Sequence, residues 1–190
     1  MSFEPILHNV SKHIQLNSKE IELFTSYLTE KRLGKGQVLL EQGAFCDGIS
    51  FVNNGILRAY FLSEEGKETT IMFAIKDWWV TDMFAFTKKK KSMLSIEALE
   101  PSMVFLLSKV NFERLLLEIP KFERFFRILM QNAYIREQQR GLENLSLTAK
   151  KKYDIFMEKY PSIASQLNQK QIASYLGITP EFLSMVRNGK

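Results

Sequence analysis

The chain has 190 residues, of which 45% are apolar and 25% charged, and its formal net charge is +5. This length fits one main domain with a small appended unit, and the composition is ordinary for a soluble globular protein. The single cysteine, Cys46, excludes a disulfide framework and a four-cysteine metal site, and the only histidines are His8 and His13. We therefore expect no bound metal, no catalytic residues and no enzyme activity.

The ends of the chain bear on location and on partners. The first residues have no basic segment followed by an apolar run, and no stretch approaches the ~20 apolar residues of a membrane span. We expect a cytoplasmic protein with no membrane partner. Residues 148–190 hold seven basic and three acidic side chains, and such a basic segment suits a polyanion such as nucleic acid.

The N-terminal residues carry a helical pattern. Ile21 and Leu28 belong to an apolar set at helical spacing, and Ser18 stands before this set, where a helix N-cap belongs. Gly34 then interrupts the pattern. We predict helix over most of residues 1–31.

Residues 38–107 have a different sequence pattern, in which short runs of β-forming residues alternate with glycine-containing or polar turns. Strands this short and this closely spaced predict a β-sandwich or barrel. The turns include Asn53-Asn54-Gly55 and Glu64-Glu65-Gly66, and Lys88 to Lys91 suggest a solvated hairpin tip. The runs are VLLE, ISFVN, ILRAYFL, TTIMFAI, WWV, SMLSIEAL and MVFLL.

Helical spacing returns from Ser108. A short helix is predicted to Leu117, and Pro120 opens a long one that reaches about Leu145. One face of the long helix repeats as a heptad seam, which favours a homodimer over a single wide stripe buried in a monomer. The seam comprises Phe125, Ile128, Asn132, Ile135, Gln139 and Leu142, and a second stripe comprises Phe122, Phe126, Leu129 and Ala133.

The end of the chain has the signals of a helix-turn-helix. Asn168 can cap a first helix, with Gln171 three residues on as in a capping box, and Gly177 suits a left-handed C-cap. Thr179 then caps a second helix, and Pro180 takes its first position. Two short helices joined by a glycine-containing turn are the arrangement that reads the DNA major groove.

Within this unit Ala173 is small because the two helices cross closely there, and Ile178, Leu183 and Val186 close a small core. The alternative is a pair of packed helices with no role in DNA binding. We expect the first helix to meet phosphates and the second to meet base edges. The predicted DNA-binding residues are Gln169, Lys170, Ser174, Thr179, Glu181, Ser184, Met185, Arg187 and Asn188.

This order of parts resembles the Crp/Fnr family of bacterial regulators, most closely the short regulators of Bacteroidetes type. The resemblance covers nearly the whole chain; it is sharpest at IASYLGITPEFLSMVR and clear at GQVLLEQGAFCDGISFVNNGILRAYFLSEEGKE. It implies an α+β fold with an RmlC-like jelly roll, and a homodimer that binds double-stranded DNA, a small-molecule effector and RNA polymerase. The expected domains are a cyclic-nucleotide-binding-like sensor at 1–118, a dimerisation helix at 119–146 and a helix-turn-helix at 147–190.

The family holds cyclic AMP with a Gly-Glu-Leu turn and an Arg-Ser or Arg-Ala pair. Here Thr81 and Asp82 stand at the turn, and Lys91 and Ser92 stand in place of the pair. Lysine offers a point charge where arginine offers a bidentate fork. We therefore expect these four residues to line an altered effector pocket, with no bound cyclic AMP and no cofactor.

Two departures from the family pattern concern the DNA-reading unit. Relatives of this type usually carry arginine where Met185 stands, and many have a β-hairpin wing after the second helix that this sequence lacks. These differences keep a second class open, a ligand sensor whose helix-turn-helix makes protein contacts. A third class, a cupin-like enzyme, shares the β-roll architecture, but the strand region here contains no histidine.

Overall fold

The computed structural model describes residues 2–188 as two four-stranded antiparallel sheets packed face to face and surrounded by helices. The predicted α+β fold with a jelly-roll core is confirmed. The strands are β1 (Leu28–Leu33), β2 (Val38–Leu40), β3 (Gly48–Asn54), β4 (Ile56–Leu62), β5 (Glu68–Ile75), β6 (Trp79–Val80), β7 (Ser95–Ala98) and β8 (Ser102–Ser108). One sheet has the order β1-β8-β3-β6 and the other β2-β7-β4-β5.

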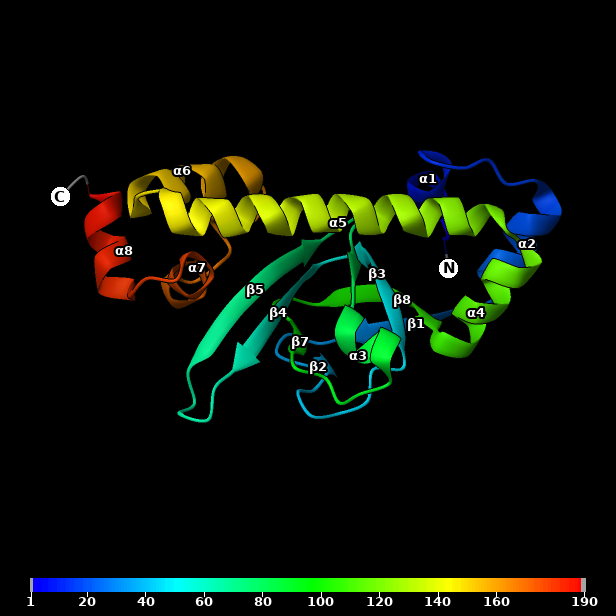
Figure 1. The fold of residues 1–190 in the computed structure, drawn as a ribbon, viewed down its shortest axis with the longest axis horizontal. Helices are drawn as coiled ribbons and strands as arrows, with labels where there is room; N and C mark the ends of the chain where they lie inside the picture. Colours follow the sequence, from blue (N-terminus) through cyan, green and yellow to red (C-terminus); the bar gives the residue numbers. More distant parts are fainter. Residues whose placement is uncertain (1, 189–190) are drawn as a thin grey trace.

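Apart from α3 (Met83–Lys88), which lies against the sandwich, the helices form two groups at opposite ends of the long α5 (Lys121–Ser146), as Figure 1 shows. The other helices are α1 (Glu4–Ser11), α2 (Ser18–Ser26), α4 (Lys109–Glu118), α6 (Ala149–Lys159), α7 (Gln169–Leu176) and α8 (Pro180–Arg187). In Figure 1, α5 runs along the sandwich, with α1, α2 and α4 near its beginning and α6, α7 and α8 near its end. The last three helices therefore form a unit beside the sheet that contains β5.

Three apolar cores hold these layers together. One fills the space between the sheets and includes Val52, Leu57 and Val104. A second joins the outer side of the β1-containing sheet to the N-terminal helices and to the first turns of α5, where Phe122 and Phe126 are buried. A third connects β4 and β5 to the C-terminal helices.

The N-terminal prediction is partly wrong. The helical pattern ends at Ser26, and Leu28–Leu33 form strand β1, which pairs antiparallel with β8. For these residues, pairing with β8 outweighs the local helical pattern. Strand pairing depends on neighbours distant in sequence, which a local pattern does not show. The cap is Asn17 and not Ser18: the Asn17 side chain accepts from the Glu20 N–H at 3.0 Å, and the Glu20 carboxylate accepts from the Asn17 N–H at 2.8 Å.

The predicted hairpin tip at Lys88 to Lys91 is also wrong in its geometry. Residues 83–88 form α3, and Lys89 ends this helix in the left-handed conformation with φ of 53°. Asp82 caps the helix through its side chain, which is the local signal that distinguishes it from a hairpin. The four lysines are exposed, as expected of a solvated segment.

The predicted long helix is confirmed as α5, but the residues predicted to form its dimer seam do not share one exposed face. Phe125 is fully buried inside the protomer against Trp79 and Phe126, so it is not part of the exposed face. Ile135 and Leu142 remain exposed. The first turns of α5 thus belong to the core shared with the N-terminal helices and the β1-containing sheet, and the later turns present exposed apolar side chains.

Candidate functional site

The last two helices begin and end where the sequence predicts. The Asn168 side chain accepts from the Gln171 N–H at 2.9 Å, and the Gln171 side chain accepts from the Asn168 N–H at 3.0 Å, which completes a capping box. Gly177 ends α7 with φ of 69°, a left-handed conformation that glycine adopts without a steric cost. The Thr179 hydroxyl accepts from the Phe182 N–H at 3.2 Å and caps α8.

The pair packs through the predicted small core. Ala173, Leu183 and Val186 are buried, and the Ile178 N–H donates to the Ala173 carbonyl at 3.0 Å across the turn. The opposite surface of the pair is open to solvent. Of the nine predicted DNA-binding residues, seven are exposed and two, Ser174 and Ser184, are partly buried. The exposed ones are Gln169, Lys170, Thr179, Glu181, Met185, Arg187 and Asn188.

Glu181 lies at the start of α8, where its carboxyl group is held in the ionised form. Hydrogen bonds from its own backbone N–H and from the Thr179 hydroxyl hold the pKa of this carboxyl below its usual value. The ionised form suits the positive end of the helix. A permanent negative charge here repels phosphate, so this side chain is better suited to accept a hydrogen bond from a base edge.

The outer face of α8 also carries an aromatic residue that the sequence analysis did not single out. Phe182 is 45% exposed and Met185 is 50% exposed. Both lie on the solvent side because Leu183 and Val186 take the inward positions at helical spacing. The surface is therefore mixed, with polar, charged and apolar side chains side by side.

Ser174 lies away from this outer face and against the sandwich. β5 is the last strand of its sheet, so one side of its backbone has no strand partner. The Thr70 N–H donates to Ser174 Oγ at 2.8 Å, and the Ser174 hydroxyl donates to the Glu68 carbonyl at 2.8 Å. Ser174, predicted to contact a phosphate, here satisfies backbone groups on the open edge of β5.

Arg140, on the last third of α5, completes the same junction. Its guanidinium donates to the carbonyl of Ile71, to that of Thr70 at 3.1 Å and to that of Tyr175 at 3.3 Å. It also lies over the Tyr175 ring, with 4.4 Å between guanidinium carbon and ring centroid. One side chain therefore links the long helix, the edge strand and α7.

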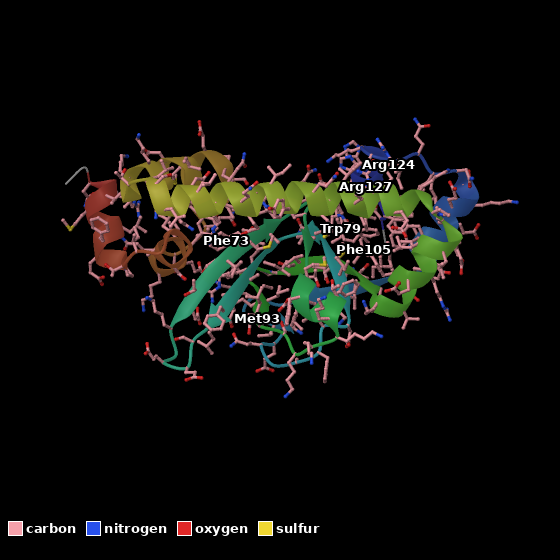
Figure 2. The ribbon with its side chains drawn as sticks, viewed as in Figure 1. Phe73, Trp79, Met93, Phe105, Arg124 and Arg127 are labelled. Atoms are coloured by element: carbon pink, nitrogen blue, oxygen red, sulfur yellow. The ribbon has the colours of Figure 1, made fainter. Side chains whose placement is uncertain are left out.

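An aromatic cluster surrounds this junction. Phe73 on β5 is fully buried, with its ring centroid 5.8 Å from Tyr160, 5.5 Å from Tyr175 and 6.2 Å from Phe156. Figure 2 places Phe73 beneath the later part of α5, on the side of the C-terminal helices. Burial raises the pKa of Tyr160, and neighbouring Tyr175 adds to the effect. Tyr160 therefore stays neutral and acts as part of the core.

The four predicted effector-pocket residues do not converge on a cavity of ligand size. Asp82 is 3% exposed; its carboxylate accepts from the N–H groups of Ala85 and Met93 and lies 2.9 Å from the Ser92 hydroxyl. Thr81 donates to the Gly48 carbonyl, and the Lys91 side chain is exposed. The only one of the four that lines the adjacent cavity is Thr81, and the volume there is about 70 Å³. Ligand pockets usually measure about 300–1,000 Å³.

Because Asp82 holds the segment after β6 together, Asp82→Ala should lower the free energy of unfolding by about 2–4 kcal/mol. The variant loses the α3 cap and the buried carboxylate that the Ser92 hydroxyl and the Met93 N–H bind. Urea denaturation measures the change. Asp47→Ala, at an exposed carboxylate, should stay within about 0.5 kcal/mol of the parent. Equal stability of the two variants would contradict this structural role.

Two other kinds of site are absent from residues 2–188. No group of three or more His, Cys, Asp or Glu side chains there could hold a metal ion. No helix in that range is long and apolar enough to cross a membrane.

Part of the chain matches a known family model. Residues 30–118, just under half of the chain, are similar to the family model of the cyclic nucleotide-binding domain. The anaerobic regulatory protein of Bacillus subtilis is 25% identical over 136 residues, which are 72% of this chain and 57% of that protein. The match therefore spans little more than half the length of this relative.

Solved structures extend the likeness to the whole architecture. The c-di-GMP-responsive global regulator CLP of Xanthomonas campestris is 10% identical with a TM-score of 0.76, and the match covers 91% of both chains. A Eubacterium rectale protein assigned to the Crp/Fnr family is 18% identical with a TM-score of 0.72, covering 92% of this chain and 83% of that one. The chain thus has the fold of Crp/Fnr regulators.

Proposed function

We propose that this protein is a DNA-binding transcription regulator of the Crp/Fnr type that acts in the cytoplasm. The observation that carries the proposal is the outer surface of α7 and α8. There, side chains that can reach phosphates, such as Lys170, lie beside ones that can reach base edges, such as Arg187, and both are exposed. The regulator fold and the net positive charge after residue 147 support the same reading.

The regulator acts as a homodimer through the later turns of α5. Ile135, Leu142 and Leu145 are exposed apolar side chains at helical spacing, and Asn132 and Gln139 are exposed between them. Such a stripe is what two copies of the helix bury against each other, with the polar members setting the register. The sensor, dimer helix and DNA-binding unit then span residues 1–118, 119–146 and 147–190.

The nucleotide pocket of this regulator is degenerate. The Asp82 carboxylate is fully engaged by protein donors, and a cavity of about 70 Å³ leaves no room for a nucleotide. We infer that cyclic AMP is not its effector. RNA polymerase is a natural partner of the DNA-bound dimer, and any effector acts through the hinge around residues 145–148.

A salt titration tests DNA binding without knowledge of the target site. A labelled 30-base-pair duplex of random sequence should bind at low salt, and log K should fall linearly with log salt concentration. Lys170→Gln should reduce the slope by about 1 for each bound protomer, or about 2 for the proposed dimer, because each protomer loses one phosphate contact. Lys19→Gln, on α2 at the opposite end of the molecule, should leave the slope unchanged.

A second candidate function is favoured by Phe182 and Met185. Two exposed apolar side chains on the outer face of α8 suit contact with another protein, in a ligand sensor whose last helices no longer read DNA. The same titration separates the two functions. Absent binding, or an affinity that does not change between about 50 and 200 mM salt, contradicts the regulator and supports the protein-contact module.

A further inference from the structure

A cavity of about 210 Å³ lies between the turn that joins β5 to β6 and the middle of α5. It is separate from the degenerate nucleotide pocket, with which it shares no lining residue. Trp78, Trp79 and Phe126 supply aromatic walls, while Asn132 and Arg136 supply polar groups from α5. Figure 2 shows Trp79 directly beneath this helix.

The aromatic walls are ordered by contacts outside the cavity. The Trp79 indole N–H donates to Asn9 Oδ1 at 2.9 Å, and the Trp79 ring meets Phe126 edge-on at 5.7 Å between centroids. Asn9 in turn donates to the side chain and carbonyl of Asp77. A flat apolar wall held in this way favours a planar ring, which gains both burial and edge-to-face contact.

Arg136 gives the cavity its charge. Its guanidinium lies over the Trp78 ring at 4.8 Å, and among residues 2–188 it forms no salt bridge or side-chain hydrogen bond. The one acidic side chain that lines the cavity, Asp77, is already paired with Lys12. A guanidinium without an acidic partner is suited to a carboxylate, which it can bind through two parallel hydrogen bonds.

We propose that this cavity binds a small aromatic carboxylate, with its ring packed against the walls formed by Trp78, Trp79 and Phe126 and its carboxylate on Arg136. The volume equals roughly seven water molecules at about 30 Å³ each, which fits one ring with a short acid group and excludes a nucleotide. The ligand would also touch Trp78, whose ring lies 6.0 Å from Tyr160 in the aromatic cluster. The site is defined without reference to DNA, so a failure of DNA binding would leave it intact, although it shares Asn132 with the face of α5 that we assign to the dimer.

The chain provides its own reporter, because Trp78 and Trp79 are its only two tryptophans. We would titrate the full-length protein with benzoate at constant ionic strength and follow tryptophan fluorescence excited at the red edge. A saturable change is expected with benzoate. Benzamide, which has the ring without the charge, and cyclohexanecarboxylate, which has the charge without the aromatic ring, should both bind at least about tenfold more weakly.

Variants of two arginines on α5 test whether Arg136 is the group that binds the carboxylate. Arg136→Gln should weaken benzoate binding by about ten- to hundredfold, and Arg136→Lys should retain part of the affinity. Arg127→Gln, at an exposed position on the same helix, should bind benzoate like the parent. Circular dichroism and thermal unfolding check that each variant is folded. The proposal is overturned if benzoate gives no saturable change, if either analogue binds as well as benzoate, or if folded Arg136→Gln binds it equally.

Discussion

Phe73→Ala should lower the free energy of unfolding by about 3–5 kcal/mol, the usual cost of removing a fully buried phenylalanine ring. The side chain has no exposed surface, and it joins β5 to three aromatic rings of the C-terminal helices. For a chain of this length the melting temperature should fall by roughly 6–20 °C. Loosening of the same contact should also make the linker at 147–148 more accessible to protease.

Differential scanning calorimetry and limited trypsin digestion measure the two effects. Trypsin can cleave after Lys150, Lys151 and Lys152, which directly follow the linker. Phe84→Ala is the matched control, because Phe84 is 48% exposed and its loss should change stability by no more than about 0.5 kcal/mol. If the Phe73 variant melted and digested like the Phe84 variant, the C-terminal helices would not be held to β5 as described.

Replacing both Ile135 and Leu142 by glutamate should convert the proposed homodimer into a monomer. Both side chains are exposed on the face of α5 that we assign to the partner, and like charges on facing helices repel. Loss of the second DNA-binding unit should then weaken binding to the 30-base-pair random-sequence duplex by about 10²–10⁴-fold, because the units no longer bind in tandem.

Sedimentation velocity and the random-sequence duplex measure mass and affinity. Asn144→Glu is the control; it adds a negative charge about two and a half turns after Ile135, on the opposite side of the helix. The control should remain dimeric with the parent affinity. A double variant that still sediments as a dimer would place the interface elsewhere, and a parent that is monomeric at all concentrations would remove the dimer from the proposal.

Local sequence signals predicted the C-terminal unit well. Asn168, Gly177 and Thr179 each determine a helix end through hydrogen bonds or φ preferences within a few residues, so their roles can be read from neighbouring positions. Gly55 was also predictable from its neighbours, as part of the turn between β3 and β4, where its φ is 96°. A Cβ at this position would collide with Ser102. α6 was not predicted, although Thr148 caps it in the same way.

Roles that depend on distant partners were not predictable. Ser174 was expected at phosphates, but its hydroxyl meets β5 backbone groups 104 and 106 residues away. Asp82 was expected to face a ligand. Its carboxylate instead accepts from the N–H groups of Ala85 in α3 and of Met93 after it, and residue spacing does not reveal that the chain folds back there. Strand β1 was taken as helix for the same reason, since only β8 makes it a strand.

The covered edge of β5 has a consequence for how the protein behaves in concentrated solution. Whenever the C-terminal helices lift away, a strand edge with free Thr70 and Glu68 backbone groups is uncovered beside the apolar Phe73 ring. An open edge next to apolar surface is a template for intermolecular β-pairing and aggregation. The C-terminal helices therefore also protect the β5 edge from aggregation, and any motion that releases them must be brief or compensated by another partner.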